Sequence, residues 1–201
     1  MSLPEFDVSG QKVLIVGAGR GIGKGIALGF AEAGAEVAVA SLTKATAGKV
    51  AEEIMAMGRK ALAVTGDATK AEGMDKITSQ VLAEFGYLDT LVTCVGDSIR
   101  KPVVQLPGSL DEGMTEDDWN NVVSINLTEA FQGCRSVGPH LLSRGQGSVI
   151  NISGWASFRG RPGYSAYDAS KAGIMRFTET VSQEWAPFGV RVNAVAPGSF
   201  P

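Results

Sequence analysis

The stretch VLIVGAGRGIG, residues 13–23, decides the fold. Four apolar residues that suit a buried strand lead into a glycine-rich turn, and the turn opens a segment in which Ile22, Ile26 and Phe30 recur at helical spacing. A turn without Cβ atoms at a helix start lets backbone N–H groups approach an anion such as a pyrophosphate. We therefore predict a strand–turn–helix unit that binds a dinucleotide, although a tight turn also uses glycines for purely steric reasons.

Short apolar runs recur along the chain, and a helix-length amphipathic segment follows each of the earlier ones. The runs lie at 13–16, 37–40, 61–64, 91–95, 149–152 and 190–195. Strands that are apolar on both faces belong in a parallel sheet covered by helices. Alternation of strand and helix implies right-handed crossovers. The sequence thus predicts one α/β domain over residues 1–201, a doubly wound, Rossmann-like parallel sheet.

Composition narrows the function classes. The 201 residues are 44% hydrophobic and 19% charged, with a net charge of −3, no long apolar run and no basic leader. We expect a cytoplasmic protein whose partners include neither membrane nor nucleic acid. Cys94 and Cys134 have no zinc or redox spacing and are expected to be buried thiols, and His140 is the single histidine. No metal site is expected, and acid/base chemistry must use another residue type.

The end of the second strand bears on the choice of cofactor. A site for NAD usually has an acidic residue there, which binds the ribose 2′-hydroxyl. This chain has Ser41 instead, with Lys44 close behind and Arg20 in the glycine turn. A hydroxyl and cations suit a 2′-phosphate, whereas a carboxylate repels it. The sequence therefore favours NADP(H) over NAD(H), unless Arg20 and Lys44 are ordinary solvated charges.

Motifs in the second half of the chain complete a pattern. Asn126 follows a helical start at Asp117, the segment YDASK spans Tyr167 to Lys171, and Pro197 precedes Gly198 after the sixth strand. With the glycine turn, the whole chain resembles the short-chain dehydrogenase/reductase (SDR) family. The resemblance and the reasoning above place the cofactor contacts at Gly17, Gly19, Arg20, Gly21, Ile22, Gly23, Ser41, Asp67, Ala68, Gly96, Tyr167, Lys171, Pro197 and Gly198.

The spacing of Tyr167 and Lys171 has a physical meaning. Residues at i and i+4 share a helix face, so the ammonium can lie near the phenol. A free phenol titrates near pH 10, and a neighbouring cation favours the phenolate. By resemblance, Tyr167 exchanges a proton with the substrate oxygen, Lys171 also binds the nicotinamide ribose, and Asn126 holds a water that relays the proton. Without the other motifs, Tyr167 and Lys171 would be interpreted as two exposed residues of an amphipathic helix with no catalytic role.

The chain departs from the family pattern at the catalytic serine. Counting back from Tyr167, the position that the family usually fills with serine is Gly154, and Ser153 lies one residue earlier. Adjacent side chains on an extended strand point to opposite faces. By resemblance, the serine hydroxyl would donate a hydrogen bond to the substrate oxygen. Losing one such donor typically costs about 3 kcal/mol of transition-state stabilisation, or on the order of a hundredfold in rate. Our hypothesis is that Ser153, a water or a substrate group substitutes.

Two further departures concern the sheet and the chain end. The segment from Thr93 to Gly96 reads TCVG where the family usually has Asn-Asn-Ala-Gly, and Val16 stands where the family usually has Thr. Family members continue after the Pro-Gly pair with a substrate-covering segment and a last strand. We therefore expect either a tail omitted from this sequence or a protein that lacks the lid.

These features predict an NADP(H)-dependent oxidoreductase that transfers hydride between nicotinamide and a carbonyl/alcohol substrate. The alternative is a catalytically weak or silent dinucleotide-binding protein of the same family. Aromatic residues at Trp155, Phe158 and Tyr164 suggest an apolar or ring-bearing substrate, although core packing explains them equally well. Residues 97–114 are predicted to form a loop over the same cleft. Family resemblance also implies a homodimer or homotetramer.

Overall fold

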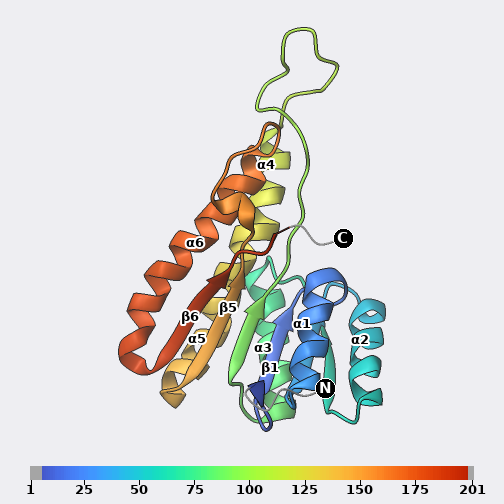
Figure 1. Cartoon of the computed structure of the whole chain (residues 1–201), viewed down its shortest axis with the longest axis vertical. Coiled ribbons are helices and arrows are strands. Elements are labelled where there is room, and N and C mark those ends of the chain that lie inside the picture. The colour runs from blue at the N-terminus through green and yellow to red at the C-terminus, as the bar shows by residue number, and fades with distance from the viewer. Residues whose placement is uncertain (1–5, 199–201) are drawn as a thin grey trace.

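Six parallel strands form one sheet in the computed structural model of the chain, which describes residues 6–198 (Figure 1). The strand order is β3-β2-β1-β4-β5-β6. The strands are β1 (Lys12–Val16), β2 (Glu36–Ser41), β3 (Ala61–Thr65), β4 (Thr90–Thr93), β5 (Gly147–Ile152) and β6 (Val190–Val195). This order is that of a doubly wound Rossmann-like domain, and it confirms the predicted fold class.

Helices cover both faces of the sheet. They are α1 (Gly21–Glu32), α2 (Lys44–Ala56), α3 (Ala71–Phe85), α4 (Glu116–Val123), α5 (Glu129–Arg144) and α6 (Ser165–Trp185). One core cluster joins the sheet to α1 and α2, and the other joins it to α3, α5 and α6. The central strand β1 alternates between them, since Val13 and Ile15 belong to the first cluster and Leu14 and Val16 to the second.

Strand β4 ends at Thr93, two residues before the end of the predicted run. The Cys94 N–H still donates to the carbonyl of Val16, the last residue of β1, at 2.9 Å. The chain then leaves the sheet beside the glycine turn. A Cβ on Gly17, whose φ is +86°, would lie 2.8 Å from the backbone of Cys94 and Val95. Gly17 is therefore needed both for its positive φ and for this close approach.

The helix predicted to follow Asp117 is interrupted near the site. Thr115 and Asp118 form a reciprocal capping box at the start of α4. A short π-helix, η2 (Ser124–Thr128), then joins α4 to α5 and contains Asn126. A π-helical turn holds an extra residue and often marks a functional position. Here the turn contains Asn126, which is fully buried.

The loop between β4 and α4 has a projecting tip. Its first residues run past the carboxyl end of the sheet, but the tip extends beyond the ends of α4 and α6 (Figure 1). The sequence placed this loop over the cleft, whereas the projecting tip points away from it. Among residues 6–198, no helix is both long enough and apolar enough to cross a bilayer.

Candidate active site

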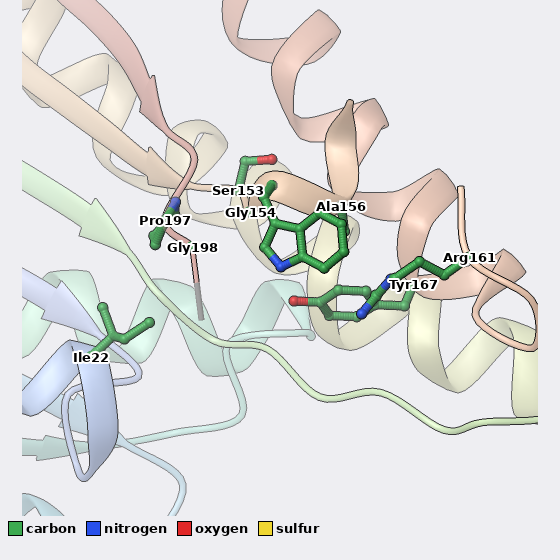
Figure 2. A pocket seen from close by; sticks show the side chains of 9 residues that line it. Ile22, Ser153, Gly154, Ala156, Arg161, Tyr167, Pro197 and Gly198 are labelled. Atoms are coloured by element: carbon green, nitrogen blue, oxygen red, sulfur yellow. The ribbon is translucent and has the colours of Figure 1, made fainter. Parts of the chain in front are cut away.

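A pocket of about 210 Å³ lies at the carboxyl end of β5 and β6 (Figure 2). Its lining comes from α1, the loop between β5 and α6, α6 itself and the segment after β6. The residues are Ile22, Ser153, Gly154, Trp155, Ala156, Arg161, Tyr167, Pro197 and Gly198. Figure 2 shows the Tyr167 side chain directed into this space from α6. Of the three aromatic residues that the sequence placed near a substrate, only Trp155 belongs to this lining.

A larger cleft adjoins the pocket and runs along the carboxyl edge of the sheet. It brings together twelve of the fourteen predicted cofactor contacts, and the remaining two, Pro197 and Gly198, line the smaller pocket. Gly23 permits the tight packing at its floor, because a Cβ there would lie 2.3 Å from the Gly17 carbonyl oxygen. The first turn of α1 follows Arg20, which makes no side-chain cap, so its N–H groups are left open, as suits an anion.

Three hydroxyl groups gather where β2 ends at this cleft. The Ser41 hydroxyl donates to the Thr43 carbonyl at 2.8 Å and lies 2.7 Å from the Thr46 Oγ1. Thr43 caps α2, and its hydroxyl is 2.8 Å from the same Thr46 oxygen. A Cβ on Gly19 would lie 2.9 Å from the Thr46 Cβ, so the glycine turn packs directly against this cluster. The described lining residues from the end of β2 and the start of α2, which are Ser41, Leu42, Thr43 and Thr46, include no carboxylate, whereas Asp67 and Asp97 in the same lining follow β3 and β4.

Tyr167 and Lys171 occupy the same face of α6, as predicted. The Lys171 Nζ is 5.7 Å from the Tyr167 ring centroid and donates to the Ile152 carbonyl at 3.0 Å. Burial raises the pKa of the Tyr167 phenol above its ordinary value, and the Arg161 guanidinium opposes this rise. The sequence argument assigned that opposing charge to Lys171. Burial also lowers the pKa of the Lys171 ammonium, which Glu129 counteracts.

Asn126 is held by two backbone carbonyls. Its Nδ2 donates to the Asp97 carbonyl at 2.7 Å and to the Val122 carbonyl at 2.8 Å. Its Oδ1 is buried and has no partner among the described residues. A Cβ on Gly96 would lie 3.3 Å from this oxygen and 3.4 Å from the Lys171 Nζ. The amide oxygen and the ammonium therefore border the same small space beside Gly96.

The structure places Ser153 and Gly154 very differently. The Ser153 hydroxyl is buried and donates to the Lys171 carbonyl at 2.8 Å, so it is engaged with the backbone of α6. Gly154 has extended backbone angles, φ 174° and ψ 162°. A Cβ there would contact only the Tyr167 hydroxyl, at 3.8 Å. The position beside the phenol therefore belongs to Gly154, as the count along the sequence predicted.

A buried polar chain replaces the asparagines that the family usually has after β4. The Thr93 hydroxyl donates to the Asn151 Oδ1 at 2.8 Å, and the Asn151 Nδ2 donates to the Thr178 Oγ1 at 2.9 Å. These contacts connect β4, β5 and α6 beneath the cleft. Thr93 thus retains a polar connection through the central sheet despite the departure from the family sequence.

Glu129 is a buried acid that the sequence analysis missed. It is 1% exposed, and its Oε1 has no hydrogen-bond partner among the described residues. Burial raises the pKa of its carboxyl well above the ordinary value, and Lys171 opposes this rise. Burial, with Glu129 nearby, likewise raises the pKa of the Cys94 thiol to about 11 and of the buried Cys134 thiol to about 12. The burial of Glu129 could have been predicted from the helical spacing, because Val122, Asn126, Glu129 and Gly133 share one helix face.

Replacing Glu129 by Gln is expected to change how stability depends on pH. Because the folded pKa is raised, folding takes up a proton: the carboxyl's contribution to stability is fully present below its unfolded pKa and is lost as pH rises through the folded pKa. Gln removes this titration. The unfolding free energy of Glu129→Gln relative to wild type should increase by ~1 kcal/mol or more between pH 5 and pH 8 in urea titrations. Glu52→Gln, on the exposed side of α2, is the control, and an equal response in both variants would contradict the prediction.

Comparison with known proteins agrees with this geometry. Residues 11–201 match the family model for short chain dehydrogenases. The chain therefore belongs to the short-chain dehydrogenase/reductase family. It is an NAD(P)-dependent oxidoreductase acting on carbonyl/alcohol substrates.

Individual relatives span nearly the whole chain. The 2-dehydro-3-deoxy-D-gluconate 5-dehydrogenase of Escherichia coli is 32% identical over 98% of this chain and 75% of its own length. The 3-oxoacyl-[acyl-carrier-protein] reductase of Synechocystis is 38% identical over 95% and 74%. A gluconate 5-dehydrogenase from Burkholderia cenocepacia, in complex with NADP and tartrate, superposes with a TM-score of 0.89 at 30% identity, covering 98% and 74%. An NAD⁺-bound xylitol dehydrogenase gives 0.87 at 30%, covering 94% and 70%.

Proposed function

We propose that this SDR enzyme uses NADP(H) and that Tyr167 exchanges a proton with the oxygen of a carbonyl/alcohol substrate. One observation carries the proposal most directly. The Tyr167 phenol points into a pocket that adjoins a glycine-lined cleft, Lys171 lines that cleft, and the Asn126 Oδ1 borders the same space beside Gly96 as the Lys171 Nζ. A bound nicotinamide cofactor would supply or accept the hydride.

The chain's own groups would then move and hold the proton. In reduction the protonated Tyr167 hydroxyl donates to the substrate oxygen, and in oxidation the phenolate accepts the proton back. The Lys171 ammonium, fixed on the Ile152 carbonyl, would also bind the nicotinamide ribose. The Asn126 Oδ1, which has no partner among residues 6–198, faces the space shared with Lys171 and suits an acceptor for a water that relays the proton.

The cofactor residues fit a dinucleotide with a 2′-phosphate. The cleft is lined by Gly17, Gly19, Gly21 and Gly23, which leave backbone N–H groups open to a pyrophosphate. At the end of β2, Ser41 and the Thr43–Thr46 pair offer hydroxyls at the start of a helix, with Arg20 also in the lining. These groups can donate to a phosphate, and no carboxylate among them repels it.

Replacing Ser41 by Asp tests the cofactor preference. A carboxylate beside a 2′-phosphate adds a repulsion of several kcal/mol before screening, so NADPH affinity should fall by roughly tenfold or more. NADH affinity should fall less or rise, because a carboxylate can bind the 2′-hydroxyl. Fluorescence titration with both cofactors measures the ratio. Ser41→Asn, which has the same shape without the charge, is the control. NADH binding more tightly than NADPH in wild type would overturn the preference.

We further propose a homodimer or homotetramer in the cytoplasm. Support for assembly comes from exposed aromatic side chains on neighbouring helices, since Trp119 is 41% and Phe131 46% exposed. Phe131 also makes an edge-to-face contact with Phe177 of α6 at 6.3 Å. Analytical ultracentrifugation tests the assembly, and cell fractionation tests the location.

A further inference from the structure

The pocket of Figure 2 contains one charged side chain, that of Arg161, among its described lining residues. Arg161 lies in the loop between the short helix η3 (Trp155–Ser157) and α6. Its guanidinium carbon is 5.5 Å from the Tyr167 ring centroid. A cation therefore stands directly beside the phenol that is proposed to meet the substrate oxygen, and the sequence analysis gave it no role.

Arg161 is held rigidly in this position. Its Nε and Nη2 donate to the Asp168 Oδ1 at 3.2 and 2.7 Å, and its backbone N–H donates to the Asp168 Oδ2 at 2.7 Å. The guanidinium also lies over the rings of Tyr164, at 4.2 Å, and Trp155, at 5.0 Å. These contacts fix the planar group before any ligand arrives, which reduces the entropy lost on binding.

One edge of the guanidinium stays available. Among the described residues, no acceptor is recorded for the Arg161 Nη1, whereas both other nitrogens bind Asp168. Asp168 is buried and does not line the pocket, so its negative charge lies behind the guanidinium as seen from the pocket. The Arg161 side chain is 26% exposed. The Arg161 Nη1 is a donor on the pocket wall that Asp168 does not bind, and such a donor suits an anionic acceptor.

We propose that Arg161 binds the carboxylate of an oxo acid whose carbonyl group reaches Tyr167. This inference rests on the proposed function of the same site and adds the substrate class. Because the guanidinium lies close to the Tyr167 ring, the carboxylate and the carbonyl group of such a substrate must be only a few bonds apart. A neutral ketone would leave the free N–H groups without a charged acceptor, whereas a carboxylate binds them with charge-assisted hydrogen bonds.

The test compares each acid with its own ester. The cofactor-loaded full chain is assayed with 2-oxobutanoate, acetoacetate and levulinate, each against its methyl ester. For at least one pair, wild type should favour the acid in kcat/KM, and Arg161→Gln should lower the acid-to-ester ratio by on the order of tenfold or more. The ratio cancels any general effect of the substitution on Tyr167. Arg161→Lys, which keeps the charge but not the fork, should retain part of the preference.

Arg159→Gln is the matched control, because Arg159 is an exposed cation two residues away and lies outside the pocket. Equal acid-to-ester ratios in wild type and Arg161→Gln would overturn the inference while leaving the oxidoreductase proposal intact. Binding of the three acids is measured separately, by ligand-observed NMR without turnover. If no substrate turns over, the proposed function fails. Loss of acid binding in Arg161→Gln alone would then still support the carboxylate site, and unchanged or absent binding would refute it.

Discussion

Tyr167→Phe should lower kcat/KM by on the order of 10²–10⁴ for any carbonyl substrate that the wild type reduces. The substitution removes the hydroxyl and keeps the ring, so the packing of the ring against Arg161 is retained. Because burial holds the pKa of this phenol above its ordinary value, the free protein carries the proton throughout the neutral range. Carbonyl reduction, which consumes that proton, should therefore show no loss between pH 6 and pH 9 that is due to Tyr167.

Tyr164→Phe is the control for this substitution. Tyr164 precedes α6 and also contacts Arg161, at 4.2 Å, but it does not line the pocket. Steady-state kinetics of both variants, with cofactor binding measured in parallel, separate a chemical effect from a structural one. Undiminished activity in Tyr167→Phe would show that the activity comes from another site. A wild type that binds cofactor and turns over no carbonyl compound would favour the catalytically silent alternative.

Gly154→Ser should raise the reductase activity by on the order of a hundredfold, since one donor to a developing oxyanion typically contributes that much. The backbone at Gly154 is extended, a conformation that serine adopts without strain. The new Cβ would meet only the Tyr167 hydroxyl, at 3.8 Å, so the added hydroxyl has room beside the substrate oxygen. The gain should appear mainly in kcat, because the donor acts most strongly in the transition state.

Two variants show whether the gain comes from the hydroxyl. Gly154→Ala adds the same Cβ without a donor and should leave the rate near that of wild type. Ser153→Ala removes a hydroxyl that is bound to the Lys171 carbonyl and should lower the unfolding free energy by about 1 kcal/mol with little change in rate. If Ser153→Ala instead lost most of the activity and Gly154→Ser gained none, Ser153 would be the replacement donor.

Several parts of the site follow from local sequence patterns. The i, i+4 spacing puts Tyr167 and Lys171 on one helix face whatever the rest of the chain does. The glycines after β1 permit the positive φ of Gly17, +86°, and the close packing of Gly23 on the Gly17 carbonyl oxygen. The absence of an acid at Ser41 is likewise visible in the sequence. Each of these features depends on residues that lie close together along the chain.

Other parts have no signal in a periodic sequence pattern. The sequence argument gave the phenol one neighbouring cation, Lys171, whose Nζ is 5.7 Å from the Tyr167 ring centroid. The folded chain adds a second, since the Arg161 guanidinium carbon is 5.5 Å from the same centroid. The position of Arg161 depends on Asp168, seven residues later, and on three aromatic rings. Loop residues without periodicity have no local signal for such contacts.

The sequence by itself determined the parallel α/β sheet, the glycine cradle at residues 17–23, the Tyr167–Lys171 pair and the missing serine at Gly154. The first three follow from periodicity and spacing, which act over one or two turns of chain, and the last follows from the resemblance to the family. Only the tertiary structure decided that the Ser153 hydroxyl faces α6, that Glu129 is buried with no partner for its Oε1 in the described part of the chain, and that Arg161 lies on the pocket wall. The physical reason is that burial and charge contacts depend on which distant segments pack together, and a pattern along one segment does not contain that information.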